Sequence, residues 1–407
     1  MKPSLKESLL VGAGIVVLLG IFFFSRKVGP VTQVPTTPSD QATAPAPAPS
    51  SVVPSAKPDL NTTGLGLKLP AGFSIETFAK NLSGARVMVF DPSGNMWVSR
   101  TSKGIVSMLE IKDGKVASQN DVMHGLRNPH GLAFNPSEPN VLYVAEETKI
   151  SKILLGTEAA PKKIADLPDS GGDHITRTLG FGPDGRLYVS IGSACNVCNN
   201  TDARRAAVSS MKPNGSDFKS FATGLRNTVF FIWDKMGRMW GTDMGRDNLG
   251  DNVPPDEINI IQEGKNYGWP ICYDDNIHDT NFDKKQYFRD PCADSVKPQV
   301  KLQAHSAPLG LAFVPQKGNW PKDYQGDLIV AFHGSWNRSV ATGYKLVKVN
   351  LDANGNYLGV EDFITGWAKG NSANTALGRP AGVLMGADGA LYVSDDKDGV
   401  IYKITHS

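Results

Sequence analysis

One short pattern occurs six times in this chain of 407 residues and limits its fold more than any other feature. Each copy has an apolar run, a turn with Asp, Pro or Gly, and a second run with an aromatic residue or Val. Turns such as PSG, PDG and ADG between alternating runs predict β-hairpins. Six hairpins of similar size predict an all-β, six-bladed propeller in which each hairpin forms the two inner strands of a blade. The copies span 87–100, 131–146, 179–192, 229–243, 310–332 and 382–396.

The ends of the repeat region supply the strands that close the ring. Residues 72–82 (GFSIETFAKNL) and 399–406 (GVIYKITH) are expected to pair between the first and last blades. A wide interval after Trp240 contains Cys272 and Cys292, and we expect it to be an insertion in the fifth blade. No long apolar pattern of period 3.6 follows the N-terminal region, which disfavours a helical or doubly wound fold.

The N-terminal residues have a different composition. Residues 9–24 are apolar and have basic residues on both sides, but no small-residue cleavage signal follows them. This favours a transmembrane anchor helix over a cleaved signal sequence. The next stretch is rich in Pro, Ala, Ser and Thr, which predicts a disordered linker. We therefore expect an anchor (1–27), a linker (28–60) and an extracytoplasmic propeller (61–407).

The four cysteines and the balance of charge exclude several kinds of cofactor and partner. CNVCN lacks the histidine of a haem attachment motif, and Cys272 with Cys292 does not provide a second CxxC for zinc. Two disulfides, Cys195–Cys198 and Cys272–Cys292, fit an oxidising compartment, and four free thiols are the alternative. Forty-two basic against 40 acidic residues give no general field for nucleic acid.

Arg and His residues precede all six inner strands. Since loops entering the inner strands of a propeller open on one rim of its channel, we expect these side chains to converge around a compact polyanion. Each Arg has the alternative of bonding turn carbonyls. His174 is the strongest candidate for a catalytic base, with Asp173 beside it to orient its ring. The residues are Arg86, Arg127, Asn128, His130, His174, Arg177, Arg226, Asn227, His305 and Arg379.

At these positions the sequence resembles the glucose/sorbosone dehydrogenase family, six-bladed enzymes that use pyrroloquinoline quinone (PQQ), and especially its sorbosone dehydrogenase-like branch. The resemblance covers residues 64–406 and rests on segments such as GGDHITRTLGFGPDGRLYVSIGSACNVC, GKNYGWPIC and HGSWNRS. It implies that His174 takes the proton from a sugar hydroxyl and that Arg226 stabilises charge on the quinone oxygen. The cofactor contacts it implies are Arg226, Asn227, His305, Arg338 and Arg379, with His333 and Lys345 as weaker candidates; for Trp336, core packing is the alternative.

The resemblance also implies calcium, held near the quinone by the backbone carbonyls of Gly245 and Arg246. The better studied glucose enzymes have a proline where Arg246 stands. The nearby acids lack the spacing of an EF-hand, so they either bind a structural calcium or cap turns. These acids are Asp247, Asp251, Asp256 and Glu257.

The resulting hypothesis is an anchored quinoprotein that oxidises an aldose or related sugar aldehyde to a lactone or acid and passes electrons to an external acceptor. No GxGxxG lies between a strand and a helix, so a nicotinamide enzyme is unsupported. Two alternatives remain: a non-catalytic propeller that binds a ligand or a protein, and a calcium-dependent lactonase.

Overall fold

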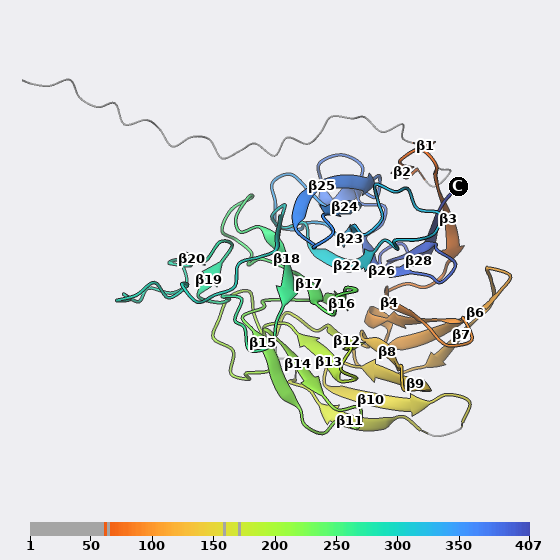
Figure 1. The fold of residues 1–407 in the computed structure, drawn as a ribbon, viewed down its shortest axis with the longest axis horizontal. Helices are drawn as coiled ribbons and strands as arrows, with labels where there is room; N and C mark the ends of the chain where they lie inside the picture. Colours follow the sequence, from red (N-terminus) through yellow and green to blue (C-terminus); the bar gives the residue numbers. More distant parts are fainter. Residues whose placement is uncertain (1–60, 63–65, 158–159, 170–171) are drawn as a thin grey trace, which may run out of the picture. The chain divides into compact units, whose positions relative to one another are not determined.

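The structure, a computed structural model, describes residues 61–62, 66–157, 160–169 and 172–407. Six four-stranded antiparallel sheets form the blades, and their innermost strands surround one centre (Figure 1). Each innermost strand contacts the next, in the order β4, β8, β12, β16, β22, β26 and back to β4. The predicted six-bladed propeller is confirmed.

The blades follow the chain. Blade 1 comprises β4 (Ala85–Phe90), β5 (Met96–Arg100), β6 (Ile105–Lys112) and β7 (Lys115–Met123). Blade 2 comprises β8 (Leu132–Asn135), β9 (Glu138–Ala145), β10 (Lys149–Leu154) and β11 (Lys162–Asp166). Blade 3 comprises β12 (Arg177–Phe181), β13 (Leu187–Ile191), β14 (Ala207–Met211) and β15 (Lys219–Thr223). Blade 4 comprises β16 (Phe230–Trp233), β17 (Met239–Asp243), β18 (Asp256–Ile261) and β21 (Val300–Leu302). Blade 5 comprises β22 (Pro308–Phe313), β23 (Leu328–Phe332), β24 (Lys345–Leu351) and β25 (Tyr357–Ile364). Blade 6 comprises β26 (Pro380–Met385), β27 (Leu391–Asp395), β28 (Val400–His406) and β3 (Phe73–Ala79). Two short pairs are β1 (Asn61–Thr62) with β2 (Lys68–Leu69), and β19 (Cys272–Tyr273) with β20 (Ile277–His278). Two 3₁₀ turns, η1 (Thr101–Lys103) and η2 (Ala373–Thr375), complete the described elements.

A turn carboxylate explains the recurring pattern in four of the hairpins. In blade 4, Asp234 Oδ1 accepts the backbone N–H groups of Met236 and Arg238, and its Oδ2 accepts the Trp240 indole N–H at 2.9 Å. Gly237 has φ = +77° in the same turn, a conformation that favours glycine. The Asp therefore fixes the turn and the aromatic anchor of the next strand together. The other pairs are Asp91–Trp97, Asp184–Tyr188 and Asp388–Tyr392.

The core lies where neighbouring blades pack on each other. The second strands β13, β17, β23 and β27 are buried at every residue. Apolar clusters run from blade to blade; one joins Trp97 of blade 1, Leu132 of blade 2 and Trp240 of blade 4. Burial of such large side chains contributes about 25 cal/mol per Å² of apolar surface, which holds the ring together and leaves its loops to form sites.

The ring closes as predicted. β3 pairs with β28 from Phe73–His406 to Ala79–Ile401, so the first and last strands of the propeller share the sixth blade. The expected position of the insertion was wrong: it lies between β18 and β21 of the fourth blade. The hairpin pattern marks only inner strands, and the short β21 after the insertion carries no such pattern.

Both predicted disulfides are confirmed, Cys195–Cys198 and Cys272–Cys292, which leaves no free cysteine. Within the described residues, no helix has the length and apolar character needed to cross a membrane. The predicted anchor (1–27) and linker (28–60) lie outside the described residues.

Candidate active site

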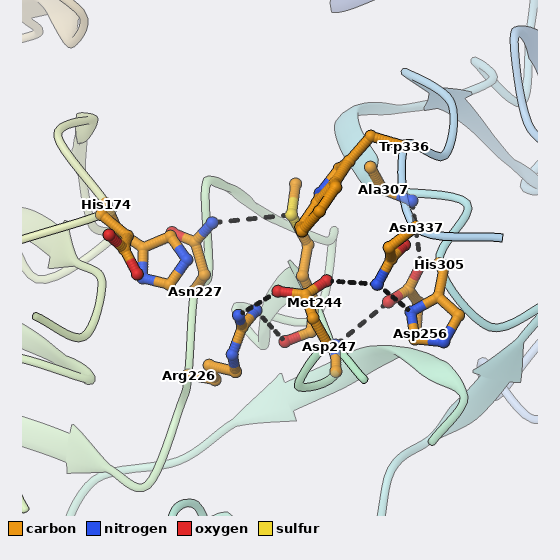
Figure 2. Close-up of a pocket in the computed structure, with 12 residues that line it drawn as sticks. His174, Arg226, Asn227, Met244, Asp247, Asp256, His305, Ala307, Trp336 and Asn337 are labelled. Atoms are coloured by element: carbon orange, nitrogen blue, oxygen red, sulfur yellow. Dashed lines mark hydrogen bonds and ion pairs between the residues drawn. The ribbon is translucent and has the colours of Figure 1, made fainter. Parts of the chain in front are cut away.

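A cavity of about 440 Å³ opens between the loops of blades 3, 4 and 5 (Figure 2). The loops before β12, β16 and β22 and those after β17 and β23 form its walls. Several predicted rim residues from three blades therefore meet at one site. The lining residues are Asp173, His174, Arg226, Asn227, Met244, Gly245, Asp247, Asp256, His305, Ala307, Trp336 and Asn337.

His174 is held by Ser193. Its Nδ1 lies 3.0 Å from the Ser193 carbonyl oxygen and 2.9 Å from Ser193 Oγ. Since a carbonyl only accepts, Nδ1 carries the proton and Nε2 keeps a free lone pair. Burial, reinforced by the charge of Arg226, lowers the pKa of His174 to about 3. His174 is therefore a neutral imidazole, the form that accepts a proton.

The sequence predicted Asp173 as the group that orients this ring, and the structure places Ser193 there instead. Arg177 pairs with Ile191, so the segments just beyond these two strand ends, with His174 and Ser193, lie side by side. Asp173 lines the cavity, and its backbone N–H donates to the Ala194 carbonyl at 3.0 Å. Strand register, which residue order does not reveal, decides the partner of the ring.

Arg226 is almost fully buried and its guanidinium is held on several sides. Nη2 donates to Asp247 Oδ2 at 2.9 Å and to Asn196 Oδ1 at 3.0 Å. Nε donates to the Asn196 carbonyl at 2.9 Å, and Nη1 to the Met244 carbonyl at 3.3 Å. Such a network fixes the plane of the guanidinium, which a lysine in this position would not provide.

Asn227 lines the same cavity and has one unpaired, fully buried polar atom. Its Oδ1 is buried and has no hydrogen-bond partner in the described part of the chain, while its Nδ2 lies 3.5 Å from Met244 Sδ. An unpaired buried acceptor costs about 1–3 kcal/mol. This oxygen lies against Gly192, where an added Cβ would be only 2.5 Å from it, so the glycine leaves room for the amide.

Buried carboxylates anchor the loops beneath the cavity. Asp243 accepts the backbone N–H groups of Asn227 at 2.7 Å and Arg226 at 3.0 Å. Asp256 accepts those of Gly245 at 3.0 Å and Ala307 at 2.9 Å. Burial raises the pKa of both carboxyls to about 7. Asp243 thereby caps the loop before β16, and Asp256 joins the loop after β17 of blade 4 to the loop before β22 of blade 5.

The acids considered for a structural calcium thus have protein partners. Asp251 accepts from the Ser339 N–H at 3.1 Å, Asp247 pairs with Arg226, and Glu257 accepts from Asn259 Nδ2 at 3.2 Å. Burial and the neighbouring Asp243 raise the pKa of Glu257 to about 8. No group of three or more His, Cys, Asp or Glu residues in the described ranges is arranged to hold a metal. Turn capping is therefore the alternative that the contacts favour.

Calcium binding by backbone carbonyls of Gly245 and Arg246 stays a prediction. Gly245 lines the cavity, and a Cβ there would lie 2.7 Å from Pro254 Cγ and 2.8 Å from the Pro255 carbonyl oxygen, so only glycine fits. The Arg246 side chain turns to the insertion, where Nη1 lies 2.5 Å from Asp279 Oδ2.

Blade 5 supplies the opposite wall. His305 Nε2 donates to the Gly250 carbonyl at 2.8 Å, which leaves Nδ1 as an acceptor 3.3 Å from Asn337 Nδ2. The same Nδ2 lies 2.6 Å from Asp247 Oδ1. Trp336 is 70% exposed and its indole stands over the cavity (Figure 2), so the core-packing alternative for Trp336 is wrong.

Other predicted residues form a second cluster between blades 1, 5 and 6, which includes no residue that lines the cavity. Asp396, after β27, binds Arg86 Nε at 2.7 Å and His333 Nε2 at 3.0 Å. Arg379 Nε donates to the His333 carbonyl at 3.0 Å, and Nη2 to that of Gly334. The sequence predicted a ring of cations that needs an external anion; here Asp396 and Asp247 supply part of the negative charge.

The remaining candidates lie outside the cavity lining. Lys345 Nζ lies 2.5 Å from Asp362 Oδ1. Arg338 donates to the carbonyls of Asp251 and Ala304, and its head lies beside a second, polar pocket of about 280 Å³ that shares Trp336. Arg127 forms ion pairs with two carboxylates, and Arg177 and His130 are fully buried.

Sequence reasoning missed Ser193, Asn196, Met244 and Asn337 at this site. Asn196 lies inside the CNVC segment and Asn337 inside HGSWNRS, both of which the sequence had singled out. In these segments the prediction named the neighbouring Cys and Arg residues, because a thiol or a guanidinium indicates a function more directly than an amide does.

Comparisons with known proteins identify the family of this chain. A family model described as TrAA12-like matches residues 67–407. The chain belongs to this family. The resemblance to glucose/sorbosone dehydrogenases is thereby confirmed.

The TrAA12-like chain is 30% identical to an uncharacterized protein of Borreliella burgdorferi over 361 residues, which are 83% of this chain and 90% of that protein. It is 25% identical to a PQQ-dependent pyranose dehydrogenase of Coprinopsis cinerea over 399 residues, 82% of this chain and 54% of that enzyme. The chain thus spans about half the length of the Coprinopsis enzyme.

Solved structures share the fold of this TrAA12-like protein. The holo PQQ domain of the Coprinopsis cinerea pyranose dehydrogenase has a TM-score of 0.69 at 22% identity and covers 84% of this chain and 97% of that chain. A calcium structure of a Trichoderma reesei family AA12 enzyme has a TM-score of 0.70 at 21% identity, with 83% and 96% covered.

Proposed function

We propose that this TrAA12-like protein is a quinoprotein oxidoreductase that oxidises a sugar, with PQQ as its cofactor. The single observation that carries the proposal is the neutral His174, with Nε2 free, in one cavity with the buried guanidinium of Arg226. The relationship to a PQQ-dependent pyranose dehydrogenase supports this choice of chemistry.

The residues of the cavity fit this cofactor. PQQ is a flat tricyclic quinone with three carboxylates, and when bound it supplies the two-electron oxidising chemistry. The exposed face of Trp336 matches a flat ligand, and Arg226 and Asn227 match polar ring atoms. Arg338 and Arg379 donate to backbone carbonyls and are not among the residues that line the cavity, so their proposed role toward cofactor carboxylates rests on the family resemblance alone.

The chain's own contribution is orientation and proton transfer. His174 Nε2 accepts the proton of the sugar hydroxyl, and the Ser193 oxygens at Nδ1 stabilise the imidazolium that forms. Arg226 places a fixed positive charge where negative charge develops during the oxidation. Trp336 covers the cavity and limits the access of water to it.

The finer features belong to the same proposal. The substrate is an aldose or a related sugar aldehyde, the product is a lactone or acid, and calcium at Gly245 and Arg246 assists the cofactor. An external acceptor receives the electrons. An N-terminal anchor holds the catalytic domain outside the cytoplasm, in keeping with the two disulfides.

The test is reconstitution. The purified protein, mixed with Ca²⁺ and PQQ, is expected to reduce a redox dye with a panel of aldoses. Hydrolysis of lactones without the quinone would instead identify a lactonase. The absence of both activities would indicate a non-catalytic propeller that binds a ligand or a protein.

The sharpest variant is His174→Ala. Turnover should fall about 100-fold to 10,000-fold, the usual contribution of a general base. PQQ affinity, measured by fluorescence titration, should stay near that of the unmodified protein. Lost affinity with retained turnover would refute the role of His174.

A further inference from the structure

The segment 193–198 (SACNVC) follows β13 and is closed by the Cys195–Cys198 disulfide. We name it the clasp. It contacts both His174 and Arg226, which belong to different blades, and no sequence feature assigned it a role beyond the disulfide. The inference below rests on the proposed function.

One end of the clasp holds the base. Ser193 binds His174 Nδ1 through two oxygens, and its own hydroxyl donates to the Cys195 carbonyl at 2.6 Å. The Ser193 N–H donates to the Arg226 carbonyl at 2.8 Å. The backbone around the base and the backbone around the arginine are thereby joined through one residue.

The other end holds the arginine side chain. Asn196 Oδ1 accepts from Arg226 Nη2 at 3.0 Å and from the Asp247 N–H at 2.7 Å, and Nδ2 donates to the Asp247 carbonyl at 3.1 Å. The Asn196 carbonyl also accepts from Arg226 Nε at 2.9 Å. One amide thus sets the position of both members of the Arg226–Asp247 ion pair.

The hydrogen bonds between Arg226 and Asn196 restrict the conformation of the arginine side chain. A long arginine side chain has many rotamers, and two parallel hydrogen bonds to a single residue select one of them. The clasp has no strand or helix of its own, so the disulfide across Cys195 and Cys198 is the covalent restraint on the position of Asn196. Because the restraint holds Asn196 and Arg226 in one conformation before the ligand binds, less conformational entropy is lost on binding and the affinity is higher.

We propose that Asn196 is a positioning residue that presents Arg226 to the cofactor, and that the Cys195–Cys198 disulfide keeps it in place. Loss of the Asn196 amide should weaken cofactor binding, while Ser193 still holds His174, the residue that meets the sugar hydroxyl. The disulfide therefore has a role in ligand binding in addition to stability.

The experiment compares Asn196→Ala with Asn354→Ala, an exposed asparagine on the β24–β25 turn whose side chain the site does not use. PQQ binding to the apoprotein is followed by tryptophan fluorescence, and sugar KM is measured at saturating PQQ. Asn196→Ala should raise the Kd for PQQ about 10-fold to 100-fold, the usual range for residues that orient a binding group. Sugar KM should change less than about threefold, and Asn354→Ala should match the unmodified protein.

Asn196→Asp provides the conservative variant. It keeps the acceptor for Arg226 and for the Asp247 N–H, but it replaces the donor to the Asp247 carbonyl by an acceptor and adds a negative charge beside Arg226. Its Kd should lie between those of the unmodified protein and Asn196→Ala. The double variant Cys195→Ser/Cys198→Ser should weaken PQQ binding in the same direction.

The outcomes separate the two proposals. If the unmodified protein binds PQQ and oxidises sugars but Asn196→Ala has the same Kd, the positioning role is overturned while the function stands. An equal rise in Kd and in sugar KM would indicate general damage and would also overturn it. If the unmodified protein neither binds PQQ nor reduces dye, the proposed function fails and the clasp has no cofactor to serve.

Discussion

His130 should make the stability of the propeller depend steeply on pH. It is fully buried at the centre, its Nδ1 lies 3.2 Å from Thr178 Oγ1, and its Nε2 has no partner among the described groups. Burial, with the charge of Arg86 next, lowers the pKa of His130 from 6.5 to about 3. A proton on Nε2 would therefore create a buried donor and a charge without an acceptor.

The lowered pKa of His130 sets the direction and the size of the pH effect on the free energy of unfolding. The unfolded chain binds a proton at His130 as the pH falls through 6.5, while the folded protein stays neutral there until about pH 3. Acid therefore stabilises the unfolded state, and the free energy of unfolding falls by about 1.4 kcal/mol per pH unit in this window. Between pH 7.5 and 4.5 the contribution of His130 is a loss of about 3 kcal/mol.

The perturbation is His130→Asn, which places an amide near the former Nδ1 and cannot titrate. Urea unfolding at pH 7.5 and pH 4.5 gives the acid-induced loss of stability for each protein. The variant has a smaller side chain, so its absolute stability falls at both pH values, but its acid-induced loss should be about 3 kcal/mol smaller than that of the unmodified protein. Equal losses in the two proteins would refute the assignment of a buried neutral histidine.

Two further predictions concern the base and the hairpins. Because the pKa of His174 is held at about 3, the pH profile of kcat/KM should show no acid limb from this base above about pH 4; a limb near pH 6.5 would contradict the buried, neutral imidazole. Asp234→Ala should lower the free energy of unfolding by about 2–4 kcal/mol, since two turn N–H groups and the Trp240 indole lose their acceptor, whereas an unchanged urea midpoint would contradict the role of the turn carboxylate.

The fold was predictable because each hairpin carries its own local signal. Asp234 and Trp240 are six residues apart and act within one turn, so the chain order alone reveals them. The insertion was misplaced because β21 is a strand of three residues whose partner β18 lies on the other side of the insertion. A short outer strand is defined by that pairing, and its residues give no independent signal.

The candidate site was predictable in its principal residues and not in their partners. His174, Arg226 and His305 stand before inner strands, and a propeller brings such positions to one rim. Their partners Ser193, Asn196 and Asn337 follow second strands, on loops that the pattern treats as connections. Which side chain meets which depends on strand register and on contacts between blades, so it required coordinates.

The sixth blade has a consequence for how the molecule is made. Its outer strand β3 is synthesised before the other five blades, and β28, the strand it pairs with, follows them in the chain. Until β28 has been synthesised, β3 has no neighbour on the side that β28 will occupy, and an unpaired strand edge readily pairs with another chain. Closure of the ring and pairing with a second chain therefore use the same strand edge.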